Sequence, residues 1–385
     1  MGDLCFVSST TLATAKRVEW PGLEKPMLFK SNLLRLLLMA ISIWLLLAAP
    51  TSAQTERKVT KLADGIYAIE HPTGPDALRS GNTMVIIGER QVFVVDSCFK
   101  QSAAREDIAQ IRQWTNKPVS FVLNTHFHND HNLGNRAYMD AFPALTIIAH
   151  VETKKSMDMF GPGSARREEK DLATLRQMLD TGKNTDGSPL TAEDKVAARE
   201  MLTARLPVVE EIKKIEFQSA TLTFDHDFSL DLGNREVQIK FLGHGNTAGD
   251  AVVYLPKEKI VVTGDLVAYP VPNIFDGYPS EWVQTLQHLA QLEADTIVPG
   301  HGPVMHDKTY LFLVRDFLKS AMDQVNAKLR QSGPAIFLTL DEVKKAVDLT
   351  PFRQRFAGND ESQGARFDFV AGNLVKLLFE EAGLR

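Results

Sequence analysis

Short apolar runs separated by turn residues recur along the chain after residue 64, and they predict β-strands. Many of these runs are rich in Val and Ile, and corners such as Gly88-Glu89-Arg90 interrupt them where the chain would reverse. The predicted strands are Gly65–Glu70, Asn82–Ile87, Gln91–Val95, Val119–Leu123, Leu145–Ala149, Thr221–Phe224, Glu236–Leu242, Ala251–Leu255, Ile260–Thr263 and Thr296–Val298.

Apolar residues at helical spacing lie between several of these runs. In Ala103–Trp114, the side chains of Ile108, Ile111 and Trp114 would share one helix face. Strands that alternate with helices are typical of α/β domains. The other predicted helices are Leu133–Met139, Trp282–Leu292, Tyr310–Leu329 and Phe367–Glu381, with further short helices after Gly333.

The stretch from about 151 to 214 has a different character, because it is polar, charged and rich in helix-forming residues. Thr191 and Asp194 have the spacing of a capping box, which predicts a helix over Val196–Leu206. We interpret this stretch as a helical insertion whose loops could overhang a functional site.

The N-terminus carries the one long apolar segment of the chain. Leu33–Ala49 is almost entirely apolar, basic residues Lys30 and Arg35 flank its start, and small residues follow it up to Ala53. This order is typical of a signal peptide cleaved after about Ala53, and an uncleaved signal anchor is the alternative. Met27 could be the true start. We therefore expect an exported, periplasmic protein with no stable membrane span after cleavage.

Composition bounds the classes of partner. The 385-residue chain is 44% hydrophobic and 24% charged, which is ordinary for a globular protein with a sizeable core. Its net charge is −5 and would become −7 on removal of residues 1–53. Because no block of like charges is present, the sequence argues against nucleic-acid and anionic-membrane partners. It makes no prediction of oligomeric state.

Cysteine usage is sparse. Cys5 would be lost with the signal peptide, so Cys98 would be the sole thiol of the mature chain and no disulfide could form within it. Cys98 follows a predicted strand, and we interpret it as a half-buried packing residue rather than a reactive thiol.

The densest concentration of chemistry follows the predicted strand Val119–Leu123. There the sequence reads Asn124-Thr125-His126-Phe127-His128-Asn129-Asp130-His131, with three imidazoles and one carboxylate within six residues. Divalent metals such as zinc take these nitrogen and oxygen donors. His126 and His128 lie two apart and would point to the same side of an extended segment, whereas the next donors lie where the chain turns toward a helix. Two adjacent metal ions are the natural interpretation.

Three further motifs each follow a predicted strand: Gly243-His244-Gly245-Asn246-Thr247, Thr263-Gly264-Asp265 and Pro299-Gly300-His301-Gly302. Together with the His-x-His-x-Asp-His loop, this order of motifs resembles the metallo-β-lactamase superfamily over roughly Val59 to His306. The resemblance implies a four-layer αββα sandwich, with a helical insertion at about 151–214 and a C-terminal helical tail. The implied domains are an N-terminal extension and signal peptide (1–53), a metallo-β-lactamase-like domain (54–306) and a helical extension packed on it (307–385).

The resemblance also implies a ligand set for two zinc ions. His126 and His128 would hold the first ion, Asp130, His131 and His301 the second, and Asp265 would bridge them. The implied activity is a zinc-dependent hydrolase in which a metal-bound hydroxide, oriented by Asp130, attacks a carbonyl or similar electrophile of a small, possibly β-lactam-like substrate. An iron-dependent oxidoreductase on the same fold and a non-catalytic metal-binding protein are the alternatives.

One position departs from the family pattern. The third ligand of the first zinc is usually a His directly before Thr or Ser, but Asn246 stands there and the nearest imidazole is His244. His244 has the same side-chain parity in an extended segment and is our candidate ligand, while Asn246 would offer a weaker carbonyl oxygen. The first metal site therefore lacks the third imidazole that the family pattern has.

Three other residues are candidates for support of the site. Asp96 resembles a family position whose acidic side chain holds the metal loop from behind. Asp250 would either accept a hydrogen bond from a ligating His or shape a turn. We interpret His150, which ends a predicted strand, as structural.

Overall fold

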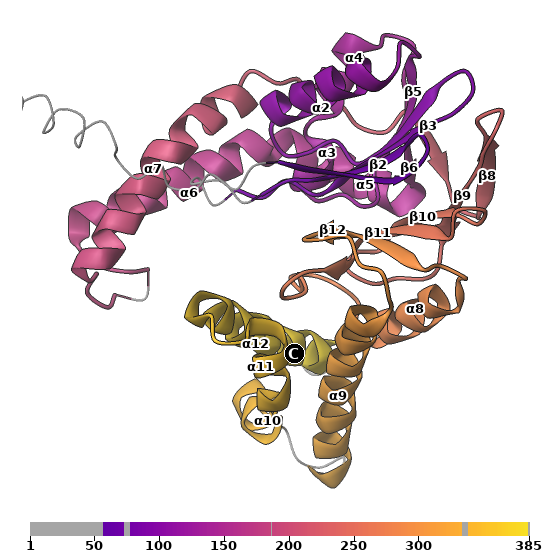
Figure 1. Cartoon of the computed structure of the whole chain (residues 1–385). Coiled ribbons are helices and arrows are strands. Elements are labelled where there is room, and N and C mark those ends of the chain that lie inside the picture. The colour runs from indigo at the N-terminus through magenta and orange to yellow at the C-terminus, as the bar shows by residue number, and fades with distance from the viewer. Residues whose placement is uncertain (1–56, 73–77, 186, 333–337, 384–385) are drawn as a thin grey trace, which may run out of the picture. The chain divides into compact units, whose positions relative to one another are not determined.

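The strands pair into two sheets and include two that were not predicted, β1 and β8 (Figure 1). The first sheet has the order β1-β2-β3-β4-β5-β6-β7, antiparallel up to β4 and parallel from β4 to β7. Its strands are β1 (Lys58–Ala63), β2 (Ile66–Glu70), β3 (Thr83–Ile87), β4 (Val92–Val95), β5 (Val119–Leu123), β6 (Thr146–His150) and β7 (Leu222–Phe224).

The second sheet has the order β12-β11-β10-β9-β8. Its only parallel pair among the described strands is β11 with β12. The strands are β8 (Phe228–Asp231), β9 (Glu236–Phe241), β10 (Ala251–Leu255), β11 (Ile260–Ala268) and β12 (Thr296–His301).

The computed structural model describes residues 57–72, 78–185, 187–332 and 338–383, all within the unit Gln54–Arg385. The predicted signal peptide, the alternative start at Met27 and the cleavage near Ala53 lie outside the described residues. Within the described part of the chain, no helix has the length and apolarity needed to cross a bilayer.

Strand side chains alternate between two cores, as the period of an extended chain requires. Met84 and Ile86 of β3 face the core between the sheets, together with Val253 of β10, while Val85 faces the helices on the outer side. Because both faces of the central strands are buried, their sequences read as continuous apolar runs.

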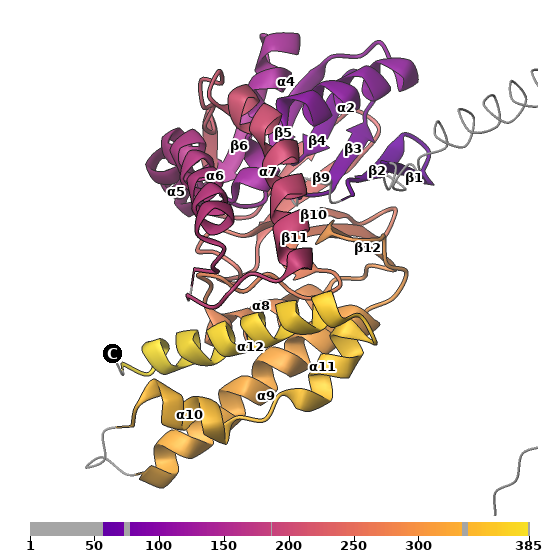
Figure 2. The same cartoon turned by 90° about the vertical axis from the view of Figure 1, so that its left-hand side faces the viewer.

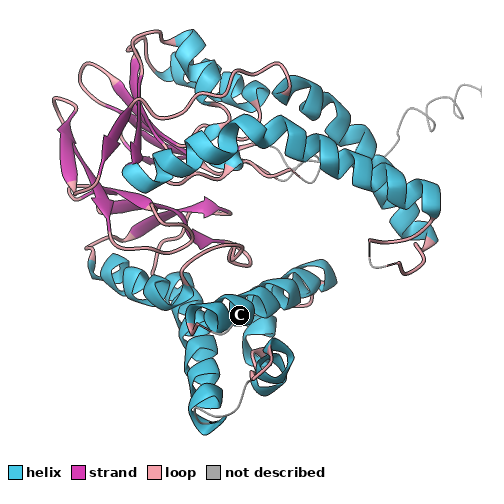
Figure 3. Ribbon diagram, turned by 180° about the vertical axis from the view of Figure 1, so that it is seen from behind, coloured by secondary structure: helices cyan, strands magenta, loops and turns pink. Residues whose placement is uncertain are grey.

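Helices cover the outer face of each sheet (Figure 3). On the first sheet they are α2 (Gln101–Trp114), α4 (Asn135–Ala141) and α5 (Val151–Phe160). On the second sheet they are α8 (Pro279–Gln291) and α9 (Thr309–Ser332), and α10 (Leu340–Ala346), α11 (Thr350–Ala357) and α12 (Glu361–Glu381) pack against these helices and one another. The predicted four-layer αββα sandwich with C-terminal helices is confirmed.

The insertion is helical, as predicted. After α5 come the 3₁₀ turn Gly161–Gly163, α6 (Ser164–Thr181) and α7 (Ala192–Ile212), and α6 and α7 lie side by side (Figure 2). Thr191 and Asp194 form the predicted capping box at the start of α7.

The C-terminal helices share one core with the second sheet. Phe317 of α9, Phe367 and Leu374 of α12, and Trp282 of α8 are buried in the same apolar cluster as Val252 of β10. These helices are therefore continuous with the sandwich in packing, and residues they carry on their inner faces can reach the edge of the second sheet.

Candidate metal centre

Three strands, β5, β11 and β12, bring the predicted ligands together. His126 and His128 lie in the loop that follows β5, and Asp130 and His131 lie in α3 (Asn129–Asn132), the one-turn helix after that loop. Asp265 belongs to β11, and His301 is the last residue of β12. The donor atoms of these residues form two groups, His126 with His128 and Asp265, and Asp130 with His131 and His301.

The first group contains two imidazole nitrogens that face each other. Nε2 of His126 lies 3.0 Å from Nδ1 of His128. His126 is fully buried, and the other ring nitrogen of His128 lies 3.4 Å from a carboxylate oxygen of Asp276. This pair has the parity that the sequence predicted for two residues of one extended segment.

The second group consists of Asp130 and His131 of α3 together with His301 of β12. Nε2 of His301 lies 3.0 Å from Oδ2 of Asp130 and 3.3 Å from Nε2 of His131. Two ring nitrogens that face each other at this distance can share one proton or bind one cation between them.

Asp265 lies between the groups. Its Oδ1 is 3.4 Å from Nε2 of His131 and 3.5 Å from Nε2 of His301, while the same side chain belongs to the group of His126 and His128. This oxygen is buried and accepts no hydrogen bond from the described residues. A buried carboxylate oxygen without a donor is costly unless a cation neutralises it.

Asp96 supports the metal loop from behind, as predicted. It follows β4 and accepts hydrogen bonds from the backbone N–H and the hydroxyl of Thr125, at 2.8 and 2.9 Å. Its Oδ2 also lies 2.8 Å from Nδ1 of His131. The carboxylate thereby fixes the ring of His131 with Nε2 directed toward the other donors.

Two glycines leave space for the ligands. A β-carbon at Gly81 would lie 2.3 Å from the ring of His131, and one at Gly300 would lie 2.0 Å from Oδ1 of Asp265. Any larger residue at these positions would displace a donor, which explains the glycine of the Pro299-Gly300-His301 motif.

The charges of the donors suit a bound cation. Burial and the adjacent imidazoles of His131 and His128 hold the pKa of His126 well below its usual value, so this ring is neutral and free to bind a metal. For Asp265, burial opposes ionisation, but the imidazoles of His301 and His131 outweigh it and keep the pKa well below its usual value.

The second group concentrates negative charge around one imidazole. Burial alone would lower the pKa of His131, but the carboxylates of Asp130, Asp96 and Asp265 raise it well above the usual value. The site thus favours positive charge at this point. Since imidazole nitrogens and carboxylate oxygens are the donors that zinc and similar divalent metals take, the residues present fit a two-metal centre.

The third motif places its two candidate donors differently. Nδ1 of His244 lies 3.1 Å from Oε2 of Glu281, and its ring packs against Phe241 and Tyr278. His244 is a member of neither group of donors. The side-chain nitrogen of Asn246, in contrast, lies 3.5 Å from Nδ1 of His128.

Two residues near the site have structural roles. Asp250 accepts a hydrogen bond of 2.7 Å from the backbone N–H of Thr247, so it shapes the turn, one of the two roles considered from sequence. His150 caps the start of α5 and stacks on Phe241, in agreement with the structural role predicted for it.

Two cavities border the centre. One, of about 350 Å³, is lined by His301 together with the basic side chains of Arg79 and Lys58. The other, of about 230 Å³, is lined by His128, Phe127 and Phe160. Phe160 ends α5, so the helical insertion contributes to the surroundings of the centre.

A C-terminal residue also reaches the centre, and sequence analysis did not identify it. The guanidinium of Arg366, on α12, donates a hydrogen bond to Oδ1 of Asn273. Nδ2 of Asn273 in turn donates to Oδ2 of Asp265 at 2.6 Å. Burial, followed by the neighbouring charge of Arg79, lowers the pKa of Arg366 to about 10, so it remains cationic at neutral pH.

Comparisons with known proteins found relatives of this chain. The model of the metallo-beta-lactamase superfamily matches residues 76–301. A linear primary-alkylsulfatase of a Pseudomonas species is 26% identical over 282 residues, which cover 68% of this chain and 48% of the relative. A type 2 metallo-beta-lactamase of Elizabethkingia meningoseptica is 28% identical over 253 residues, which cover 64% of this chain and 79% of that enzyme. The chain thus spans about half the length of the alkylsulfatase.

Among solved structures, a double mutant of the sec-alkyl sulfatase PisA1 aligns with a TM-score of 0.55 at 13% identity, over 85% of this chain and 50% of that chain. A metallo-beta-lactamase from Pontibacter korlensis aligns with a TM-score of 0.48 at 19% identity, over 69% of this chain and 99% of that chain. At 13% identity, the likeness to PisA1 supports the fold alone.

Proposed function

Since this chain belongs to the metallo-β-lactamase superfamily, we propose that it is a zinc-dependent hydrolase of small anionic esters, with alkyl sulfates as the first candidates. His126, His128 and Asp265 would hold one ion, and Asp130, His131 and His301 the other, with Asp265 shared between them. Zinc held by such donors acidifies a coordinated water to a pKa near about 7 and so supplies a nucleophile at neutral pH.

Asp130 is the candidate catalytic residue. Burial would raise its pKa, but the imidazoles of His131 and His301 lower it overall, so its carboxylate is ionised at neutral pH. Its side chain is 25% exposed, whereas Asp265 is 1% exposed. Asp130 therefore combines a negative charge with access to the reacting molecules, and it would accept a hydrogen bond from the attacking water and orient it.

Two cavities beside the centre support the proposed substrate class. The cavity at His301 is lined by Arg79 and by Lys58, whose ammonium pairs with Glu70 at 3.0 Å. Arg366 is joined to the centre through Asn273. We therefore expect Arg79 and Arg366 to be the cationic partners of an anionic head group. Phe127 and Phe160 line the cavity at His128 together with Arg167 and Asp276, and an alkyl chain would pack on the two aromatic rings.

One observation carries this choice of substrate most directly. Arg366 is a guanidinium joined to the shared ligand Asp265 through a single amide, Asn273. A planar fork of N–H donors at this position matches the oxygens of a sulfate group or carboxylate. The alkylsulfatase relative makes sulfate esters the first class to test.

A β-lactam is the second candidate substrate, because the Elizabethkingia relative is a metallo-beta-lactamase of which this chain covers 79%. The carboxylate of such a substrate would meet the same cationic side chains.

A panel of substrates tests the proposal. The zinc-loaded protein would be given a medium-chain alkyl sulfate, the corresponding neutral acetate ester and a chromogenic β-lactam, before and after removal of metal by a chelator. We expect release of sulfate that disappears on chelation and returns with zinc. Turnover of the neutral ester at a rate equal to or above that of the anionic substrates would contradict the proposed substrate class.

Export and domain organisation are part of the same proposal. The apolar segment Leu33–Ala49 supports a cleaved signal peptide and a periplasmic location. N-terminal sequencing of the protein from its native source should then find a chain that begins near Gln54. An intact Met1 or Met27 would contradict the cleavage. The shared core of α9, α12 and β10 supports residues 307–385 as an extension that folds together with residues 54–306.

A further inference from the structure

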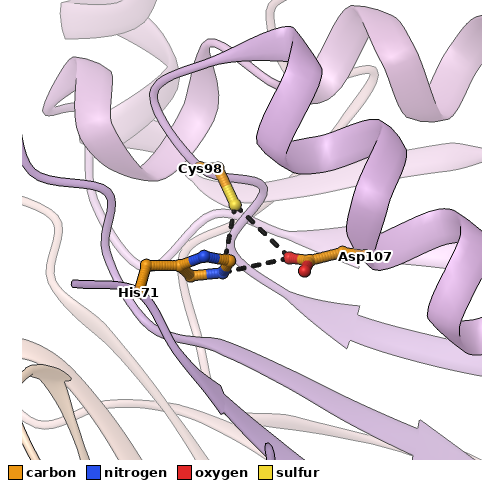
Figure 4. Close-up of side chains that lie close together, drawn as sticks. All are labelled: His71, Cys98 and Asp107. Carbon is orange, nitrogen blue, oxygen red and sulfur yellow. Dashed lines mark hydrogen bonds and ion pairs between the residues drawn. The ribbon is translucent and has the colours of Figure 1, made fainter. Parts of the chain in front are cut away.

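A second cluster of metal-binding side chain types lies apart from the two groups of the centre. It consists of His71, Cys98 and Asp107, which come from the residue after β2, the loop after β4, and α2. Figure 4 shows the thiol, the imidazole edge and the carboxylate directed at one another. The side chains of His71 and Asp107 are 6% and 0% exposed, and Cys98 is 0% exposed.

The three donor atoms form a nearly equilateral triangle. Nε2 of His71 lies 3.1 Å from Oδ2 of Asp107 and 3.3 Å from Sγ of Cys98, and the latter two atoms are 3.4 Å apart. Zinc bonds of about 2.0 to 2.3 Å in tetrahedral geometry separate neighbouring nitrogen, oxygen and sulfur ligands by about 3.3 to 3.6 Å. The triangle is therefore close to the size of one face of a zinc tetrahedron.

Hydrogen bonding alone accounts poorly for this convergence. Nε2 of His71 faces Oδ2 of Asp107, Sγ of Cys98 and, at 3.4 Å, Oγ1 of Thr83. A ring nitrogen has one N–H or one lone pair, so it can satisfy only one of these three partners well. A cation placed at the centre of the triangle would satisfy all three of the ionisable donors at once.

From this geometry we propose that His71, Cys98 and Asp107 form a mononuclear zinc site, separate from the two-metal centre. The set of one sulfur, one nitrogen and one oxygen donor suits a borderline-soft divalent ion. Its two anionic donors, thiolate and carboxylate, balance the charge of the ion. The other carboxylate oxygen of Asp107 is 2.7 Å from the guanidinium of Arg57, which fixes Oδ2 toward the cluster.

Zinc binding at this cluster would displace the proton of the Cys98 thiol. Burial, followed by the nearby charge of Asp107, raises the pKa of the Cys98 thiol well above its usual value, so the thiol is protonated without metal. When the S–Zn bond forms, the S–H bond breaks and the proton passes to solvent, as in other thiolate sites. The same burial and raised pKa argue against Cys98 as a catalytic nucleophile.

A fourth ligand and a path for entry are available from the cavity at His301. His71 lines that cavity of about 350 Å³, so water can reach the imidazole side of the cluster. Three protein ligands with water in the fourth position are an established arrangement for zinc.

The position of the cluster indicates a structural role. Bound zinc would tie the end of β2 and the helix α2 to the loop after β4. That loop also contains Asp96, which holds His131. The third site would thus stiffen the support of the two-metal centre without touching its ligands.

Cobalt binding can be followed at this site separately from the two-metal centre. The two-metal centre offers only nitrogen and oxygen donors, and in a Cys5→Ser background Cys98 is the sole thiol of the full chain. A thiolate-to-cobalt charge-transfer band therefore reports on Cys98 alone and does not depend on activity. We expect the band in metal-free full-length protein titrated with Co²⁺, and three ions per chain at saturation.

Matched variants complete the test. Cys98→Ser should lose the charge-transfer band and one of the three bound ions. His71→Gln and Asp107→Asn should each weaken Co²⁺ binding at this site at least about tenfold. His226→Gln, at an exposed histidine, is the control and should change neither the band nor the number of ions. If a variant fails to fold, the Cys5→Ser protein, which retains Cys98, still tests the site by the presence or absence of the band. Saturation of the protein with cobalt without a charge-transfer band, or a band that persists at full strength in both His71→Gln and Asp107→Asn, would overturn the site. Loss of hydrolysis with the band intact would contradict the proposed function alone.

Discussion

Oδ2 of Asp96 lies 2.8 Å from Nδ1 of His131, so the group of Asp130, His131 and His301 is held in place by a carboxylate that belongs to neither group of candidate donors. The same side chain fixes the backbone N–H of Thr125 at the start of the ligand loop. Asp96, directly after β4, therefore fixes both the loop that begins at Thr125 and the orientation of the His131 ring.

Replacement of Asp96 by Asn should weaken the centre. Asn tolerates the positive φ of 60° at this position, so the change removes the charge with little backbone strain. We expect a loss of about 10- to 100-fold in metal affinity at the second group, because the orientation of His131 and the basicity of its ring both decline. Competition with a chelating dye measures this affinity. Wild-type affinity in Asp96→Asn would contradict the role, and Asp225→Asn, at an exposed aspartate, is the control.

Arg366 should determine the preference for anionic substrates. Arg366→Ala should raise KM for an alkyl sulfate by about 10- to 100-fold, the size expected for loss of a charge-assisted contact, while turnover of a neutral ester stays near wild type. Arg366→Lys should recover part of the affinity, since it keeps the charge and loses the planar fork. Steady-state kinetics on both substrates separates these outcomes. If Arg366→Ala loses the same fraction of kcat/KM on the alkyl sulfate and on the neutral ester, the role of Arg366 is structural. Arg330→Ala, at an exposed arginine of α9, is the control and should leave both values unchanged.

His244 and Asn246, the two candidate ligands of the third motif, are expected to behave differently when they are replaced. Because His244 pairs with Glu281 whereas Asn246 adjoins His128, we expect His244→Ala to keep the wild-type number of metal ions. Asn246→His should bind metal at the first group about tenfold or more tightly, since an imidazole is a better zinc donor than an amide. Metal titration into chelated protein measures both. If His244→Ala loses one ion per chain, His244 is a ligand, as the sequence alone suggested.

Asp250 should make stability depend on pH. Burial raises its pKa to about 7, against 3.8 for an ordinary aspartate. Its ionisation therefore costs folding free energy: the cost is absent below pH 3.8, grows as pH rises, and is complete above about pH 7. The free energy of unfolding of Asp250→Asn minus that of wild type should therefore increase by up to about 4 kcal/mol when the pH is raised from 4 to 8.

Urea denaturation of wild type and Asp250→Asn across this pH range tests the point. A difference in free energy of unfolding that is the same at pH 4 and pH 8 would show that Asp250 titrates normally. Asp295→Asn, at a side chain 76% exposed, is the matched control.

Most of the fold could be predicted because its strands are buried on both faces. Runs such as Val92–Val95 have no polar residue to confuse their assignment, and their order with the helices left few topologies. The strands that sequence analysis missed are β1 and β8. Both are edge strands with exposed, partly charged sequences, for which hydrophobic pattern gives little signal.

The candidate ligands were visible in sequence because they occur in short motifs that follow predicted strands. Arg366 and Asn273 were not, because nothing local in α12 indicates which of its polar residues faces a sheet edge. His71, Cys98 and Asp107 were missed for a related reason. They have no common spacing, and only the pairing of β2, β3 and β4 brings the ends of these strands near α2.

Anomalous diffraction at the zinc absorption edge, from crystals of the zinc-loaded protein, is the most direct measurement of the two-metal centre. We predict one peak among His126, His128 and Asp265 and a second among Asp130, His131 and His301, each about 2.0 to 2.2 Å from its ligand atoms. A map from zinc-saturated crystals with no peak at one or both of these groups would contradict a two-metal hydrolase.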